Sequence, residues 1–309
     1  MKKIMKPLLF ISLFVLLSLF VAACTKTNTP SVLLTPVDSF EHAHGLAVDI
    51  ADSNKLLIAT HDGLFLSVNE QDQNKKSQQK LYRIGDMEDD LMGFSAHPAQ
   101  PDVFFASGHP ARGGNLGVVQ STNGGYTWKK IANGVNGPVD FHTMAISLAN
   151  PNLLYGWYDG ELQKTLDGGT TWTVVETDVP TEIISLHPDP KDEQTVYAVV
   201  IGGLMVSNDQ GAHWADVGEQ MSNNAVIALA VNPQDPQKMV SFSRNLGLAV
   251  STDGGKTWES QPDFEKYEDI PLYLVFDPQQ STTLYALSKS NKLYKSVDHA
   301  ATWIEITWA

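Results

Sequence analysis

Short apolar stretches separated by tight polar turns recur along most of this chain of 309 residues. Each repeat opens with an apolar stretch that ends near a Pro or Asp turn. Two further strand-like stretches follow, and then a turn rich in Asp and Gly. Short runs bounded by Gly, Pro and Asp predict β-strands rather than helices. We expect the opening strands of six repeats at residues 44–48, 92–96, 142–146, 182–186, 227–231 and 272–276.

A turn of the form S/T-x-D/N-x-G-x-x-W closes the third strand of five repeats. Successive copies start 44, 42, 44 and 45 residues apart. A period of this size, with four strands in each repeat, indicates a β-propeller with one blade per repeat. The sequence therefore predicts an all-β fold, a six-bladed β-propeller over residues 40–309, with no helix in that part. The five copies are Ser121–Trp128, Thr165–Trp172, Ser207–Trp214, Ser251–Trp258 and Ser296–Trp303.

The residue types of this turn suit a tight loop between antiparallel strands. The Asp or Asn side chain folds back on the following amides, and the Gly supplies a positive φ. The Trp buries a large surface while its N–H still needs a partner. These turns resemble the Asp boxes, or BNR repeats, of sialidases, sortilin-type receptors and the photosystem II assembly factor. In those families the box is structural and lies opposite the binding face, which implies the same arrangement here.

Two repeats depart from the Asp-box pattern. Ala300 replaces the Gly of the last copy, and the first repeat keeps only Ser67 and Asn69 before a polar loop. Nearly the whole mature chain also resembles a group of bacterial Asp-box lipoproteins that are often labelled glycosyl hydrolases, a label that establishes no activity. That resemblance rests on the strings 40–46, 60–64, 90–94 and 107–110.

The first residues have the pattern of an export signal. Three lysines precede the apolar run 8–20, which is short for a membrane span. Val21, Ala22 and Ala23 then lead to Cys24, the only cysteine, and this sequence resembles a bacterial lipobox. The alternative for Cys24 is an ordinary signal peptide or a buried free thiol.

The lipobox interpretation divides the chain into three parts. Residues 1–23 are expected to be a lipoprotein signal peptide, 24–39 a lipidated tether rich in Thr, Asn, Ser and Pro, and 40–309 the propeller. The protein is then anchored through lipid on Cys24 at the extracytoplasmic face of a bacterial cell membrane.

The charge of the chain narrows the choice of partners. The formal net charge is −14, and the three lysines that precede residue 8 lie in the expected signal peptide. A strongly acidic domain disfavours nucleic acid as a partner and direct adhesion to an anionic bilayer. It suits cationic partners, metal ions or simple solubility.

Propeller topology sorts the nine histidines by face. We define the top face by the loops that enter the first strand of each blade and those that join its second and third strands. Four histidines fall in bottom turns or variable Asp-box positions, namely His97, His187, His213 and His299. The other five map to the top of blades one to three, and they are His42, His44, His61, His109 and His142.

Carboxylates accompany the top histidines. When the strands of the repeats are aligned, one repeat position falls at the mouth of the channel, and it is occupied by His44, Met92, His142 and Glu182. Such residues can hold a divalent metal, form a polar pocket for a small ligand, or bind only water and backbone. The tentative metal ligands are His44, His61, His109 and His142, and a possible divalent metal is the only cofactor considered. The full set of candidate ligand-binding residues is His44, His61, Asp62, Asp90, His109, Arg112, Asp140, His142, Asp159 and Glu182.

Two classes of function stay open. The first is a recognition or assembly module that binds a peptide, glycan, small molecule or metal on its top face. The alternative is a glycoside hydrolase of sialidase-like propeller fold, which requires two suitably spaced carboxylates. A sialidase uses three arginines on its substrate, and this chain has only Arg83, Arg112 and Arg244, with no R-I-P motif. No catalytic residue is therefore assigned.

Overall fold

The computed structural model describes residues 34–71 and 77–308. The expected signal peptide and Cys24 lie outside the described residues. Among those residues, no helix is long and apolar enough to cross a membrane. The only helix described is a 3₁₀-helix, η1 (Pro262–Tyr267), which the sequence does not predict.

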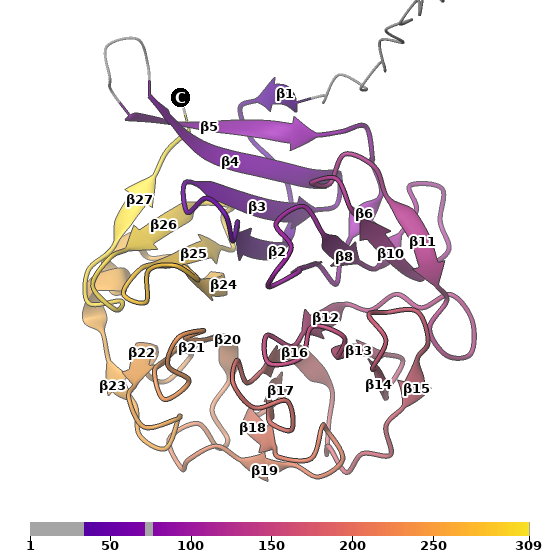
Figure 1. Cartoon of the computed structure of the whole chain (residues 1–309). Coiled ribbons are helices and arrows are strands. Elements are labelled where there is room, and N and C mark those ends of the chain that lie inside the picture. The colour runs from indigo at the N-terminus through magenta and orange to yellow at the C-terminus, as the bar shows by residue number, and fades with distance from the viewer. Residues whose placement is uncertain (1–33, 72–76, 309) are drawn as a thin grey trace, which may run out of the picture. The chain divides into compact units, whose positions relative to one another are not determined.

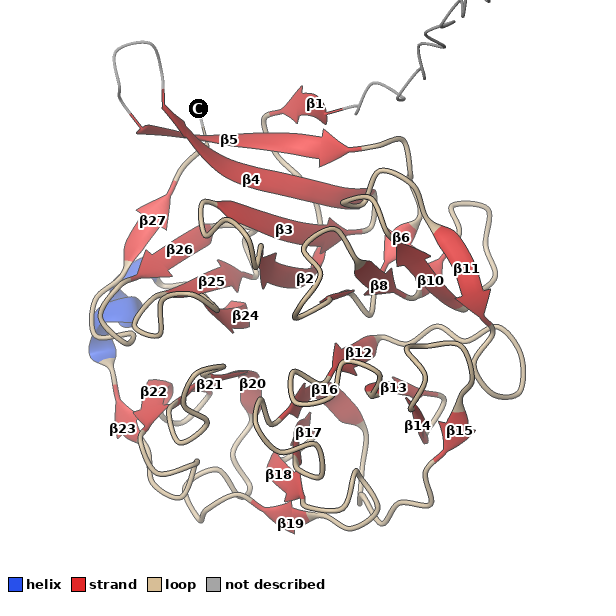
Figure 2. Ribbon diagram, viewed as in Figure 1, coloured by secondary structure: helices blue, strands red, loops and turns tan. Residues whose placement is uncertain are grey.

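The described strands form six antiparallel sheets arranged in a ring (Figure 1), which confirms the predicted six-bladed β-propeller. In each blade the first strand of the repeat lies innermost and the last lies outermost (Figure 2). Blade one is β2 (Ala43–Val48), β3 (Lys55–Thr60), β4 (Gly63–Gln71) and β5 (Ser77–Ile84). Blade two is β7 (Ser95–Ala96), β8 (Phe104–Ala106), β10 (Val118–Ser121) and β11 (Lys129–Ala132).

The remaining four blades have the same order. Blade three is β12 (Thr143–Ile146), β13 (Leu154–Tyr158), β14 (Glu161–Thr165) and β15 (Thr173–Val174). Blade four is β16 (Ile183–Pro188), β17 (Val196–Val200), β18 (Gly203–Ser207) and β19 (Ala215–Asp216). Blade five is β20 (Val226–Val231), β21 (Met239–Ser243), β22 (Gly247–Ser251) and β23 (Glu259–Ser260). Blade six is β24 (Pro271–Phe276), β25 (Leu284–Ser288), β26 (Leu293–Ser296) and β27 (Ile304–Ile306).

Blade one has a fifth strand, β1 (Leu34–Val37), which pairs with the outer edge of β5. These residues belong to the segment predicted as tether, so the boundary predicted at residue 40 is placed too late. A short edge strand that contains Pro36 gives little sequence signal, because Pro and polar neighbours are also typical of linkers.

The Asp boxes have the structural role that the sequence predicts. In the box of blade three, the Thr165 hydroxyl accepts a hydrogen bond from the Gly169 amide at 3.2 Å, and Asp167 accepts one from the Thr171 amide at 2.9 Å. The Trp172 indole N–H donates to the Gly169 carbonyl at 2.9 Å, so its polar group is satisfied inside the core. In the last box Ala300 takes the position of the Gly at φ 71°.

The chain closes the ring between blades six and one without exchanging a strand. The Tyr273 hydroxyl donates to the Ala43 carbonyl at 3.1 Å, and the Ser53 hydroxyl donates to Asp277 at 2.9 Å. Trp308 donates its indole N–H to the Ser67 hydroxyl at 2.9 Å. Ser67 belongs to the degenerate first Asp box, so a tryptophan from the end of the chain binds to the serine of that box.

The inner strand of blade two is interrupted near the top. β6 (Asp90–Leu91) leaves the blade to pair with β9 (Gly108–His109), and β7 resumes after a turn in which the Phe94 amide donates to the Met92 carbonyl at 2.8 Å. A Cβ on Gly93 would lie 2.5 Å from the Phe141 carbonyl oxygen, and one on Gly108 would lie 2.0 Å from that of Asp90. Both positions therefore need glycine, and the irregular geometry is built into the sequence.

We predict that Trp172→Ala or Trp258→Ala lowers the free energy of unfolding by about 3–5 kcal/mol, because each indole is buried in the core between blades. Thermal and denaturant unfolding measure the effect. Ile304→Ala is the control, since Ile304 is 63% exposed and its loss is expected to be nearly neutral. Equal melting temperatures for the Trp variants and the control would contradict a structural role for the boxes.

Candidate functional site

One side chain from each inner strand stands at the top of the central channel. In blades one, four, five and six the pairing with the second strand shifts by one residue at this point, which is a β-bulge. A bulge leaves one residue unpaired and turns its side chain away from the regular pleat. The six equivalent residues, which we call the mouth ring, are His44, Met92, His142, Ile184, Ile227 and Leu272.

The register confirms the predicted equivalence of His44, Met92 and His142, but the inclusion of Glu182 is wrong. Ile184 occupies that position in blade four, because Ser185 pairs with Val199 as Gly45 pairs with Ala59. Glu182 lies two residues earlier along the chain, where its carboxylate accepts a 2.5 Å hydrogen bond from the Trp157 indole. The equivalent position of blade four was thus predicted two residues too early, because the adjacent apolar residues Ile183 and Ile184 leave the start of its opening strand ambiguous in the sequence.

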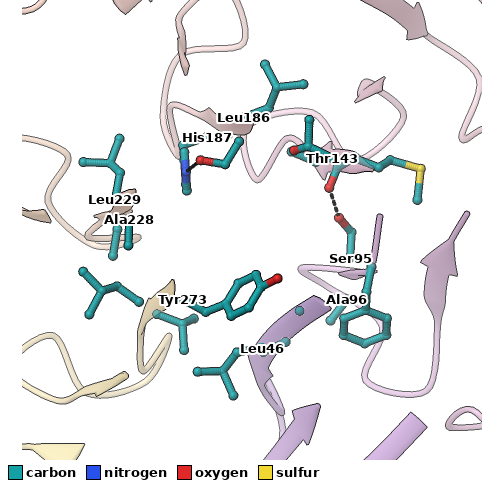
Figure 3. A pocket seen from close by; sticks show the side chains of 18 of the residues that line it. Leu46, Ser95, Ala96, Thr143, Leu186, His187, Ala228, Leu229 and Tyr273 are labelled. Carbon is teal, nitrogen blue, oxygen red and sulfur yellow. Dashed lines mark hydrogen bonds between the residues drawn. The ribbon is translucent and has the colours of Figure 1, made fainter. Parts of the chain in front are cut away.

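A cavity of about 600 Å³ lies below the mouth ring and is lined by the inner strands of all six blades. Figure 3 shows part of its wall, with Leu46, Leu186, Leu229 and Tyr273 contributed by four different blades. His187 also lines the cavity, with its Nε2 2.9 Å from the Ser185 hydroxyl. Its burial lowers its pKa to about 4, so this ring is neutral at neutral pH. The prediction that His187 lies in a bottom turn is wrong, because the residue belongs to strand β16.

The first histidine cluster joins blades one and two and consists of His44, His61 and Asp90. The Nδ1 atom of His61 lies 2.5 Å from Oδ2 of Asp90, and the Nε2 atom of His44 lies 3.4 Å from Oδ1. The rings of His44 and His61 are 4.3 Å apart between centroids. Three potential ligand atoms thus lie within 4.8 Å of one another.

The second histidine cluster joins blades two and three and consists of His109, Asp140 and His142. The Nε2 atoms of His109 and His142 lie 2.7 and 2.8 Å from the same oxygen, Oδ2 of Asp140. Asp140 is only 2% exposed, whereas both histidine rings reach solvent. These three ligand atoms also lie within 4.8 Å of one another.

The strand pair β6–β9 places the two clusters side by side. Asp90 of the first cluster and His109 of the second are directly paired residues in this antiparallel ladder. Side chains of such a pair lie on the same face with their Cβ atoms about 4.5–5.5 Å apart. The interruption of blade two therefore supplies one ligand to each cluster from a single short hairpin.

Hydrogen-bond accounting leaves buried atoms of both clusters without partners. Within the part of the chain that the structure describes, His44 Nε2, Asp90 Oδ1 and Asp140 Oδ1 are buried side-chain atoms that form no hydrogen bond. A buried polar atom without a partner costs about 1–3 kcal/mol, and more if the group is charged. Three of the six such atoms among the described residues lie in these two clusters, where a cation or a ligand would satisfy them.

His44 is neutral at neutral pH, which makes it available as a ligand. Burial is the largest effect and lowers its pKa to about 4. Asp90 opposes this shift, whereas the neighbouring histidines His61, His42 and His142 add to it. His44 is therefore neutral at neutral pH, and a neutral imidazole has the lone pair that a metal requires.

His109 carries a more specific indication. Its Nδ1 lies 3.1 Å from the Gly114 carbonyl oxygen, which can only accept, so Nδ1 bears the proton. In a neutral ring Nε2 then presents a lone pair to the Asp140 carboxylate, and this arrangement is repulsive unless a cation or a second proton lies between them. Metal-bound histidines commonly donate their other N–H to a backbone carbonyl in this way.

The structure gathers six of the ten candidate site residues into these two clusters, although the sequence predicts one shared pocket. The other four lie outside both clusters. Asp62 and Asp159 are exposed, the latter in a turn at φ 51°, and Arg112 is also exposed. His42, which was not among the candidate site residues, packs its ring 5.1 Å from that of His61.

The comparisons with known proteins agree with the fold. Residues 249–260 match the model of the BNR/Asp-box repeat. The structure is similar to a GH74 enzyme of Niastella koreensis, with a TM-score of 0.57 and 16% identity over 86% of this chain and 47% of that one. It is also similar to YCF48 bound to a D1 peptide, with a TM-score of 0.55 and 15% identity over 88% of this chain and 84% of that one. The chain is therefore an Asp-box β-propeller.

Sequence similarity extends to xyloglucanases. The chain is 28% identical over 140 residues to a probable oligoxyloglucan-reducing end-specific xyloglucanase of Neosartorya fischeri, which is 40% of this chain and 17% of that protein. It is 26% identical over 244 residues to a xyloglucanase of Hypocrea jecorina, which is 61% of this chain and 28% of that protein. The chain spans less than a third of the length of these curated relatives.

Proposed function

We propose that this protein is a lipid-anchored, extracytoplasmic binding module that holds divalent transition-metal ions on the top face of blades one to three. The observation that carries this proposal is the pair of adjacent clusters, each with two imidazoles and one carboxylate around unpartnered buried atoms. Imidazole with carboxylate suits zinc, copper, iron, nickel and manganese rather than calcium or magnesium.

The distances within the clusters support a metal site. Three ligands about 2.1 Å from one ion lie about 3.0–3.4 Å from one another. The separations of 2.7 and 2.8 Å in the second cluster, and of 2.5 and 3.4 Å in the first, need only small side-chain rotations to reach that spacing. Three protein ligands leave at least one coordination position open, so a bound ion can hold a further ligand such as a peptide or glycan oxygen.

Metal binding also relieves the electrostatic cost of the site. Asp140 is almost fully buried, and an isolated buried carboxylate is strongly unfavourable unless it is paired or coordinates a metal. The alternative is a protonated His109 that forms an ion pair with Asp140. The two arrangements differ in an observable way, because only the first gives stoichiometric binding of added metal.

We predict that the purified propeller binds up to two equivalents of Zn²⁺ in isothermal titration calorimetry at pH 7.5. Asp140→Asn, which keeps the shape of the side chain, is expected to remove one equivalent or weaken it by more than about 10-fold. His213→Ala is the matched control, because His213 also pairs with an aspartate, Asp209 at 2.6 Å, but in an exposed Asp box with no second histidine. Failure of the unmodified protein to bind Zn²⁺, Cu²⁺ or Mn²⁺ would refute the proposal.

The location is tested separately. We expect Cys24→Ser to move the protein from the membrane fraction to the soluble fraction or to block its processing, because the thiol is the proposed site of lipid attachment. Fractionation of cells that express the full chain, followed by immunoblotting, measures this. Membrane retention and maturation that do not change on substitution would argue against a lipoprotein.

A glycoside hydrolase is the second candidate, favoured by the similarity to xyloglucanases. Asp140, which is buried, and Asp90, which is partly buried, are the candidate carboxylates of the top face, but each has an oxygen in close contact with histidine nitrogens. A hydrolase would release reducing sugar from xyloglucan and lose this activity in Asp90→Asn and Asp140→Asn. We expect no release above the level of these two variants, and a clear difference from them would favour the hydrolase.

A further inference from the structure

We propose that the central channel binds a linear fatty acid, with its carboxylate at a metal ion of the mouth and its alkyl chain against the inner strands below. This inference rests on the proposed metal-binding function and names the class of molecule that the bound ion holds. The two features meet directly, because His44 of the first cluster and His142 of the second both line the cavity of about 600 Å³. Sites for small organic molecules commonly measure about 300–1,000 Å³, so the cavity is large enough for one such ligand.

The wall of the channel carries no carboxylate, amine or guanidinium group. The whole chain has 35 Asp and Glu and 21 Lys and Arg residues, yet none of the described residues that line the cavity is of these types. Two polar side chains of the wall bond back to the backbone, since the Ser95 hydroxyl donates to the Met144 carbonyl at 2.8 Å and the Tyr273 hydroxyl to the Ala43 carbonyl at 3.1 Å. A molecule that displaces water from this wall must therefore be mostly apolar.

Side-chain size keeps the channel open. Two residues below each member of the mouth ring lies an apolar side chain that lines the cavity, and the six are Leu46, Phe94, Met144, Leu186, Leu229 and Leu274. Figure 3 shows Leu46, Leu186 and Leu229 of this set. The alternate positions of blades one, two and five carry only small residues, namely Gly45, Ala47, Gly93, Ser95, Ala228 and Ala230. Larger side chains there would fill the space that a ligand needs.

The two ends of the channel differ. Its lining runs along blade one from His44 at the mouth to Ile50, six residues further, which span about 20 Å in extended conformation. The end opposite the mouth is apolar, with Ile50, Leu148 and one proline from each of blades two, four, five and six. His187, which also lines the channel, is neutral because its burial lowers its pKa to about 4. The channel therefore fits a long molecule whose single polar end lies at the mouth.

A carboxylate is the polar end that the mouth favours. Carboxylate oxygen is a regular ligand of zinc, and each cluster of three protein ligands leaves a coordination position open. The net charge of −14 disfavours anions over the rest of the surface, so a fatty acid is attracted only where a bound cation offsets that charge. The other half of the mouth ring, Ile184, Ile227 and Leu272, gives the first methylene groups an apolar contact.

A chain-length series tests the tail and the head. Octanoate, decanoate and dodecanoate are titrated into the Zn²⁺-loaded protein by calorimetry, below their micelle concentrations. One molecule is expected to bind, about 3–4-fold more tightly for each added methylene, because every methylene leaves water for the channel. 1-Octanol has the same chain as octanoate without the carboxylate, and we expect it to bind at least about 10-fold more weakly. Removal of Zn²⁺ with EDTA is expected to weaken decanoate binding by a similar factor.

A blocked mouth tests the location. Ile184 is 47% exposed in the mouth ring, so Ile184→Trp places a large ring at the opening without changing the core. This variant is expected to bind decanoate more than about 10-fold more weakly, because most of a ligand's surface is buried in such a site. Ile201→Trp is the matched control, with a change of less than about 2-fold, because Ile201 is 64% exposed in the same blade and does not line the cavity.

The outcomes distinguish this inference from the proposed function. Binding of Zn²⁺ without decanoate, or an affinity that does not rise with chain length, overturns the fatty-acid site and leaves the metal site standing. Equal losses in Ile184→Trp and Ile201→Trp place the ligand on the apolar surface of blade four, and decanoate binding that EDTA does not change removes the metal from the head group, so each overturns the inference. Failure to bind Zn²⁺ refutes the proposed function as well. If Ile184→Trp does not fold, the chain-length series on the unmodified protein decides.

Discussion

The inner strand of each blade must present one side chain to the mouth of the channel, and in blades one, four, five and six a β-bulge at that point fixes which one. The ring arrangement follows from six sheets that pack face to face, but the chemistry of the mouth follows from this single residue per blade. In four blades the bulge is explicit in the strand register. A shift of one residue would replace His44 with a neighbour from the other face of the strand.

Blade two is the exception on which the candidate site depends. Its inner strand breaks at Met92–Phe94, and the freed segment β6 pairs with β9 above the blade. Two glycines at positions where a Cβ would collide with backbone make this break possible. The break places Asp90 against the histidines of blade one and His109 against Asp140 of blade three. An uninterrupted inner strand in blade two would leave each cluster one ligand short.

The fold could be predicted from sequence because five Asp boxes repeat at a nearly constant spacing and each box is stabilised locally. Sorting His44, His61, His109 and His142 to one face needed only the strand order. The division into two clusters could not be predicted, because it depends on the irregular pairing of β6 with β9. Glu182 was misplaced because two adjacent apolar residues, Ile183 and Ile184, follow it and leave the start of the strand ambiguous, and β1 was assigned to the tether because it is short and contains a proline.

Two carboxylates, one buried and one partly buried, explain why the site carries so many histidines. Asp90 and Asp140 sit at the interfaces between blades, where no lysine or arginine ion pair is formed to them among the described residues. The charge of each carboxylate must be balanced by imidazolium or by a metal ion, since a buried charge without compensation costs about 3–5 kcal/mol. His44 is held neutral by burial, so His44 itself does not supply this balance at neutral pH. A cation shared between imidazole lone pairs and carboxylate oxygens would satisfy the charge and the unpartnered atoms at once, and this is the electrostatic basis of the proposed metal site.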